Sequence, residues 1–297
     1  MTAEAPATEL PLARAEAGGY PWRLLRQQWL GLLGGAITAL MVALAVLGPY
    51  VTPYDPNETS TAVLKAPGGS HWFGTDEFGR DTFSRVLAGA RTSISVPLAA
   101  MVLGVAAATL LGMLSAYGGG PLDLALQRVM DTFLSLPTLI LAMFFVAIFG
   151  ADAKNLVIVL SIAVVPPVQR VARASALAVL QQPYVEAARA VGAGPWRLLA
   201  YHVLRNIATP IVVISTTGVG ALILAQAGLG FLGLGVTPPT AEWGQMLSLA
   251  RPRALDAPWL ALFPGGAISL AVLGFNLLGD TLRDAWDPRL RSRLEGS

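Results

Sequence analysis

The 297-residue chain is rich in apolar side chains, at 54%, and only 13% of its residues are charged. Soluble domains carry about 25% charged residues, so the composition excludes an ordinary soluble domain and indicates a membrane protein. The chain has no cysteine and only two histidines. These counts exclude a disulfide framework, a thiol nucleophile and the usual Cys/His metal cage.

Six windows without charged side chains predict six membrane spans, because a helix that crosses about 30 Å of hydrocarbon needs about 20 mostly apolar residues. The fourth window is short and contains Pro166 and Pro167. We therefore expect this span to be kinked or to borrow length from the residues around Arg170. The windows are residues 27–54, 92–122, 132–151, 155–169, 206–241 and 257–279.

The distribution of basic residues predicts the orientation. An even number of spans puts both ends of the chain on one side, and an N-in, C-in arrangement places 13 of the 20 Lys and Arg residues in the cytoplasm. The first apolar run is too long for a secretory signal, so we expect an uncleaved anchor. The predicted regions are a cytoplasmic tail (1–26), the anchor (27–54), an extracytoplasmic loop (55–91), a five-helix core (92–284) that includes a cytoplasmic loop (170–206), and a second cytoplasmic tail (285–297).

The cytoplasmic loop 170–206 predicts two short amphipathic helices. Pro183 and Pro195 suit first helical turns, and Gly192 and Gly194 separate the two helices. Two readings stay open. The first helix covers the bundle at the membrane surface, or it docks into another chain and offers the Glu186 carboxylate at the contact. The residues expected on one face of the first helix are Tyr184, Ala187, Ala188 and Val191, and those of the second are Trp196, Leu199 and Val203.

The extracytoplasmic loop contains a compact polar motif between residues 73 and 81. Gly74 and Gly79 permit turns, while Thr75 and Asp76 can cap the backbone that follows them. Arg80 can pair with the adjacent Asp81 or bridge to a neighbouring chain. The motif is thus either a self-satisfied turn or a contact surface for another chain.

Polar groups within the spans allow alternatives. Asp131 is expected to pair with Arg128, one turn away, in preference to acting in a proton relay. The glycines that follow the fifth span indicate either an outer segment that lines a vestibule or close helix packing; they are Gly228, Gly230, Gly233 and Gly235. Other polar residues could face a translocation path or bond between helices; they are Ser215, Thr216, Thr217, Gln226 and Asn276.

Four separated motifs resemble those of known membrane permeases. Glu186-Ala187-Ala188, with Gly192 and then His202-Val203-Leu204, resembles the EAA signature of bacterial ABC importer permeases. Arg205 stands where that signature usually has proline. The other three resemble the "C"-type subunits of the dipeptide/oligopeptide/nickel branch; they begin at Phe73 (FGTDEFGRD), Phe231 (FLGLG) and Phe275 (FNLLGD).

The resemblance implies an all-α integral membrane protein of the type I ABC importer permease kind, with a cytoplasmic coupling helix, in the bacterial inner membrane. Its implied partners are a sister permease in a heterodimer, two ABC ATPase subunits and an extracytoplasmic solute-binding protein. It also implies that the ATPase-coupling residues are Tyr184, Glu186, Ala187, Ala188, Val191, Gly192 and Gly194, and that the extracytoplasmic motif comprises Gly74, Thr75, Asp76, Gly79, Arg80 and Asp81.

The residues themselves are consistent with a non-catalytic subunit. Neither Lys65 nor Lys154 stands in the G-x-x-x-x-G-K-[ST] pattern that binds nucleotide phosphates. ATP and magnesium are therefore expected on partner subunits, with no cofactor on this chain, and nucleic acid is not an expected partner. Spans without charges disfavour, but leave open, a stand-alone secondary transporter or channel; a membrane scaffold is a third reading.

Overall fold

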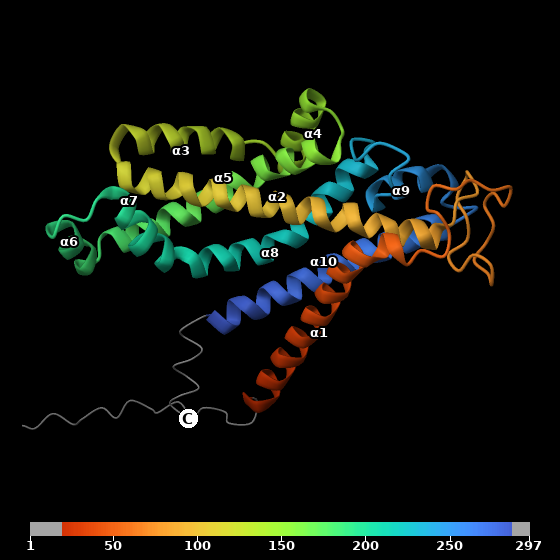
Figure 1. Cartoon of the computed structure of the whole chain (residues 1–297), viewed down its shortest axis with the longest axis horizontal. Helices are drawn as coiled ribbons and strands as arrows, with labels where there is room; N and C mark the ends of the chain where they lie inside the picture. Colours follow the sequence, from red (N-terminus) through yellow and green to blue (C-terminus); the bar gives the residue numbers. More distant parts are fainter. Residues whose placement is uncertain (1–19, 287–297) are drawn as a thin grey trace, which may run out of the picture.

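The computed structural model describes residues 20–286, and this part of the chain is almost entirely helical (Figure 1). Residues 20–286 contain no strand, only an isolated bridge between Thr75 and Asp81, so the prediction of an all-α protein is confirmed. Most of the two predicted tails lies outside the described residues. The elements are α1 (Tyr20–Leu47), η1 (Gly48–Tyr50), α2 (Thr82–Gly118), α3 (Gly120–Leu134), α4 (Thr138–Phe149), α5 (Ala153–Leu180), α6 (Pro183–Ala190), α7 (Pro195–Arg197), η2 (Leu198–Val203), α8 (Leu204–Phe231), α9 (Trp243–Ala250), η3 (Arg251–Arg253) and α10 (Trp259–Trp286).

The described residues contain five helical runs long and apolar enough to cross a membrane. The third predicted span is different, because α3 and α4 meet at 95° and count as one span only if a broken one is allowed. The break falls at Pro137, which has an extended ψ of 133°. A residue that precedes proline avoids the helical region, so the helix ends before Pro137 and restarts at Thr138. The number of candidate spans is therefore five or six.

The fourth predicted span is longer than its charge-free window. Helix α5 continues through Pro166 and Pro167 and past Arg170 as far as Leu180. The expectation that this span borrows length from the residues around Arg170 is thus confirmed. Its extension carries the chain directly to α6.

Helices α2 and α5 form the centre of the bundle by packing closely through small residues. A side chain on Gly104 would meet Val164, and one on Gly112 would meet Ala172. Ser161 also donates a hydrogen bond across the pair to the carbonyl of Ala100, at 3.1 Å. Small residues let two backbones approach closely, which is the main source of helix association in lipid.

Helix α1 packs along α10 on one side of the bundle (Figure 1). Gly34 faces Leu277, and Gly274 faces Ile37, each with no room for a side chain. This contact fixes the first span to the last one. The anchor therefore belongs to the packed structure of the chain.

Two groups of connecting segments lie at opposite ends of the bundle, whereas α4 and its connections lie between them (Figure 1). The loop between η1 and α2 and the short helix α9 lie at one end, whereas α6 and α7 lie at the other. At the α6 end, Gly119 and Gly120 have φ values of 57° and 49° and turn the chain sharply from α2 into α3. The two glycines thus make a tight turn between these helices.

Candidate functional site

Helix α6 presents most of its surface to solvent. Val185 is fully buried and anchors the helix, while Tyr184, Glu186 and Ala187 are exposed. Within the described chain, Glu186 forms no ion pair. Ala188, expected on the same face as Tyr184, is instead half-buried against the core. The exposed face of α6 is therefore narrower than the sequence predicted, and it includes the Glu186 carboxylate.

A glycine cap fixes the end of α6. The Gly192 N–H bonds to the Arg189 carbonyl at 2.9 Å, and the Ala193 N–H bonds to the Ala188 carbonyl at 3.0 Å. These two bonds form a Schellman motif. The motif requires Gly192 to adopt a φ of 85°, which side chains of L-residues disfavour. Gly194, by contrast, has an ordinary φ of −70°.

Two side-chain contacts join α6 to the bundle besides Val185. The guanidinium of Arg189 lies 5.8 Å from the ring centre of Tyr117, at the end of α2. The rings of Tyr184 and His202 lie 6.1 Å apart. After α6, a π-helical turn (η2) joins α7 to α8, at the place where the family signature ends with Arg205 in place of proline.

The second predicted helix is only partly as expected. Leu199 and Val203 are buried, which agrees with the predicted face. Trp196, predicted on that face, is 72% exposed. It lies at the start of α7, before the π-helical turn changes the spacing of side chains around the axis.

Two ion pairs connect α3 to α5, close to the α6 end. Arg173 binds both carboxylate oxygens of Asp123, at 2.6 and 2.5 Å. Asp131 pairs with Arg170 at 2.5 Å. The prediction that Asp131 pairs with Arg128 is wrong, because the packing of α3 against α5 brings a basic residue closer than the next helical turn does.

Residues 73–81, called the outer motif from here on, lie at the end of the bundle opposite α6. They form a turn that is held together by its own residues. One Asp76 oxygen accepts the backbone N–H groups of Phe78 (2.9 Å) and Arg80 (3.0 Å). The other accepts Nε of Arg80 at 2.7 Å. Gly79 has a φ of 72°, and a side chain there would collide with the carbonyl of Ser60.

Further contacts attach the motif to its surroundings. The Thr75 hydroxyl donates to the carbonyl of Ala62 and accepts the N–H of Lys65 at 2.9 Å. Gly74, with a φ of 72°, packs against the carbonyl of Lys65 and the indole ring of Trp259. The motif therefore joins its own loop to the start of α10.

Asp81 caps the first turn of α2. Its carboxylate accepts the Ser84 N–H at 2.8 Å and lies 2.9 Å from Nδ1 of His71. Of the two options for Arg80, the pair with Asp81 is not formed, since each residue has a different partner: Asp76 for Arg80, and His71 for Asp81. Consecutive side chains point in different directions at the start of a helix, which explains why Arg80 and Asp81 have different partners.

Glu242 is a buried carboxylate that the sequence analysis did not identify. Its side chain has no exposed surface and accepts the N–H groups of Gly244 and Gln245, both at 2.8 Å. Gly230 and Gly235 lie against it, with no room for side chains. Burial raises the pKa of Glu242 to about 7, although the two N–H bonds act in the opposite direction. No charge run or motif in the sequence marked this residue.

An open groove of about 690 Å³ runs between α4, α8, α9 and α10. Gly228 lines this groove, whereas Gly230 and Gly235 pack closely against neighbouring residues. The vestibule reading therefore fits Gly228, and the close-packing reading fits Gly230 and Gly235. The five polar residues that could face a path or bond between helices do not line this groove; its hydroxyl groups belong to Thr138 and Ser269. Ser215, Thr216 and Thr217 donate to carbonyls of their own helix, and Gln226 donates to the Thr92 carbonyl at 3.3 Å.

Apolar helices joined by exposed polar segments at both ends define a multi-pass membrane protein. The arrangement of the helices agrees with a solved structure, an inward-facing conformation of the MetNI methionine ABC transporter. The TM-score is 0.54 at 17% identity, and the match covers 68% of this chain and 96% of the other. This similarity shows the fold of an ABC importer permease.

Sequence comparisons identify the family. The profile described as "Binding-protein-dependent transport system inner membrane component" matches residues 108–292, and that of the "N-terminal TM domain of oligopeptide transport permease C" matches residues 19–67. This chain belongs to the family of binding-protein-dependent transport system inner membrane components. It is therefore a permease component of an ABC importer, located in the inner membrane.

Similar curated proteins cover nearly the whole chain. The probable D,D-dipeptide transport system permease protein DdpC of Escherichia coli (strain K12) is 42% identical, over 90% of both chains. The dipeptide transport system permease protein DppC of Alkalihalophilus pseudofirmus is 40% identical, over 92% of this chain and 91% of its own. The glutathione transport system permease protein GsiD of Pectobacterium atrosepticum is 39% identical, over 95% of this chain and 96% of its own.

Proposed function

We propose that this chain forms half of the translocation path of an ATP-driven importer for small peptides. The similarity to permeases for dipeptides and glutathione supports this substrate class. The apolar groove between α4, α8 and α10 offers two hydroxyl groups and no charged side chain. A peptide would therefore meet a surface that discriminates little between side chains, and selection would fall to the solute-binding protein.

In this proposal the chain spans the membrane six times, with α3 and α4 as one broken span and both ends in the cytoplasm. A sister permease completes the path, two ATPase subunits bind at the α6 end, and the solute-binding protein docks at the outer loop. ATP and magnesium bind to the ATPase subunits, and the permease binds no cofactor. The position of α6 and the outer loop at opposite ends of the bundle supports placing the ATPase subunits and the solute-binding protein on opposite sides of the membrane (Figure 1).

One observation carries the coupling role: α6 is anchored by Val185 yet leaves Glu186 and Ala187 exposed. Helix α6 also follows directly from α5, which packs against α2 through the centre of the bundle. When the ATPase subunits close on ATP, α6 would move with them, and α5 would carry the motion to the bundle. Rigid packing favours such transmission over local deformation.

Variants of α6 in the assembled importer test the coupling role. We expect Glu186→Lys to reduce peptide uptake at least about tenfold, because charge reversal across a docked contact costs several kcal/mol, while ATP hydrolysis continues. Gly192 is a poor site for a bulky residue, because its φ of 85° would strain the cap. To test the effect of a bulky residue next to α6, Gly194→Trp is preferable to a substitution of Gly192, because Gly194 has an ordinary φ and open space around it.

Crosslinking gives an independent readout. The chain has no cysteine, so Val191→Cys, at a side chain 87% exposed, should form a disulfide with a cysteine placed in the ATPase cleft. Leu255→Cys, at the opposite end of the bundle, is the control. If the complex assembles and neither the crosslink nor the uptake defect is seen, the assignment of α6 as the coupling helix is wrong.

A further inference from the structure

A row of exposed side chains follows the segment that joins α6 to α8. Arg197, Tyr201 and Arg205 are all exposed, and they stand four residues apart on α7, η2 and α8. Residues at this spacing share one face of a helix, and the wider turn of the π-helix η2 keeps them in line. We call these three residues the basic ridge. The opposite face is buried, and its members are Leu199, Val203 and Ile207.

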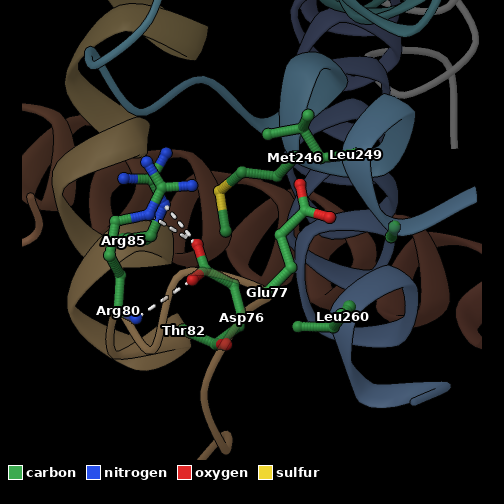
Figure 2. Close-up of a pocket in the computed structure, with 9 residues that line it drawn as sticks. Asp76, Glu77, Arg80, Thr82, Arg85, Met246, Leu249 and Leu260 are labelled. Atoms are coloured by element: carbon green, nitrogen blue, oxygen red, sulfur yellow. Dashed lines mark hydrogen bonds and ion pairs between the residues drawn. The ribbon is translucent and has the colours of Figure 1, made fainter. Parts of the chain in front are cut away.

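The two arginines of the basic ridge carry charge that no carboxylate neutralises. Among residues 20–286, neither Arg197 nor Arg205 makes an ion pair. The buried arginines at the other end of the bundle differ, because Arg80 and Arg85 share the carboxylate of Asp76 (Figure 2). The ridge therefore offers two free guanidinium groups on either side of a phenol ring, and an anionic surface would complement it.

Contacts between helices give the depth of Arg205 along the bundle. Helix α8 runs antiparallel to α2, and Gly218 lies against the side chain of Met101. A hydrogen bond nearer the outer end gives the same register to within one residue. Arg205 precedes Gly218 by 13 residues, so it is level with Leu114, which follows Met101 by 13 residues.

The same level can be located on α5, which runs parallel to α2. Gly112 lies against Ala172, so Leu114 is level with the position two residues after Ala172. That position lies four residues past Arg170, where the charge-free window of α5 ends, and four residues rise about 6 Å. The headgroup layer extends roughly 5–7 Å beyond the hydrocarbon on each side. Arg205 therefore lies at the depth of the lipid headgroups.

The rest of the ridge has the composition of a membrane interface. Tyr201, which is 65% exposed, and Arg197 follow one and two turns farther from the hydrocarbon, and long amphipathic side chains can reach back toward it. Trp196, beside Arg197, is 72% exposed. Tryptophan and tyrosine are enriched where a span leaves the membrane, and a guanidinium binds phosphate through paired hydrogen bonds.

We propose that the basic ridge binds the phosphate groups of anionic phospholipids in the leaflet on the α6 side. Arg197 and Arg205 bind the phosphates, and Tyr201 packs among the headgroups between them. Phosphatidylglycerol is favoured over phosphatidylcholine, because the choline ammonium offsets the phosphate charge in the latter. The ridge lies far from the groove between α4, α8, α9 and α10, so the proposal does not depend on the proposed function.

Fluorescence quenching at the ridge tests lipid binding in the assembled importer. This chain has no cysteine, so Ala200→Cys, at an exposed position beside Tyr201, can carry one bimane label when the partner subunits lack cysteine. In phosphatidylcholine nanodiscs, we expect spin-labelled phosphatidylglycerol to quench the label at a lower mole fraction than spin-labelled phosphatidylcholine does. Arg197→Gln and Arg205→Gln should each raise the half-quenching fraction of phosphatidylglycerol about fivefold, the effect of one basic residue near an anionic surface. Arg205→Lys, which keeps the charge, should raise it less.

Matched controls separate the ridge from general charge effects. Arg251→Gln and Arg253→Gln are the same substitutions at exposed arginines of η3, at the opposite end of the bundle, and they should leave the half-quenching fraction unchanged. Equal quenching by the two lipids overturns the proposal. So does loss of the ATPase subunits from the ridge variants with quenching unchanged, because the ridge then contacts protein. The ridge arginines are exposed and make no ion pair within residues 20–286, so we expect these variants to fold.

Discussion

At the α9 end of the bundle, single residues make several of the polar interactions. Glu242 holds the first turn of α9 through two backbone N–H groups, in a site where Gly230 and Gly235 leave space only for its carboxylate. Within residues 20–286 it has no ion-pair partner. A carboxyl group in such a site keeps its proton to unusually high pH, because burial disfavours the charged form.

The raised pKa of Glu242 predicts that stability falls as pH rises. The folded protein holds this proton up to about pH 7, whereas the unfolded chain releases it near pH 4.5, the ordinary pKa. Between these values the folded state binds more protons, so the free energy of unfolding should fall by roughly 1.4 kcal/mol per pH unit. Thermal unfolding of the purified protein from about pH 5 to about pH 8 measures this slope.

Glu242→Gln should remove the slope, because the amide does not titrate. Glu58→Gln, at an exposed loop residue, should keep it. The same pH dependence in both variants would show that another group is responsible.

At the scale of elements, α3 is attached to α5 mainly by charge. The Asp123–Arg173 pair makes two short bonds, and its side chains are 19% and 29% exposed. Ser115 and Gln127 also bond to Asp123. The Asp131–Arg170 pair makes one bond, with both side chains about half exposed. The first pair should therefore hold α3 against the helix that leads to α6.

Double-mutant cycles can compare the two pairs. We expect a coupling energy of about 1–3 kcal/mol for Asp123 with Arg173, because a bidentate charged pair is strong when water is partly excluded. For Asp131 with Arg170 we expect no more than about 0.5 kcal/mol, as in other exposed pairs. Unfolding of the purified protein after substitution of each pair by Asn and Gln gives both values. Equal coupling energies would contradict this ranking.

The elements also show how far sequence reasoning reaches. Apolar windows predicted the long helices well, since the length of a span is set by the thickness of the membrane. They missed the 95° break before α4, although Pro137 was visible, because proline inside a span often only kinks a helix. The partner of Asp131 was missed for a different reason. Spacing along one helix identifies neighbours on that helix, and it cannot identify Arg170 on a helix that packs against it.

The outer motif shows the same limit at a candidate site. The turn at Gly74 and Gly79 was predictable, because glycine marks positive φ. The partners His71 and Arg85 were not, because they depend on how the loop folds back over α2. Glu242 was not predictable either, since a single carboxylate in a polar loop normally faces solvent.

For the whole molecule, the proposed orientation can be tested with single cysteines. A membrane-impermeant thiol reagent added to intact cells should label Val63→Cys and Leu255→Cys, which are 52% and 97% exposed at the outer end. It should not label Val191→Cys until the cells are permeabilised, because α6 faces the cytoplasm in the proposal. Labelling of Val191→Cys in intact cells would invert the orientation and remove α6 from the reach of any ATPase.

The groove between α4, α8, α9 and α10 is open along one side of the chain. A path that opens alternately to the two sides of a membrane needs a second wall and a source of energy. Spans without charged residues at mid-membrane give no group that would couple transport to an ion gradient. The chain should therefore depend on other subunits for both the wall and the energy.

We accordingly expect the isolated chain in liposomes to accumulate no peptide, whether ATP, a proton gradient or a sodium gradient is supplied. Addition of the sister permease, both ATPase subunits and the solute-binding protein should restore ATP-dependent uptake, measured with a labelled dipeptide and with labelled glutathione. The Glu186→Lys chain in the same full assembly is the control for coupling. Accumulation driven by an ion gradient in the isolated chain would contradict the importer mechanism and favour a secondary transporter, because a half-path with one open side cannot hold a solute gradient by itself.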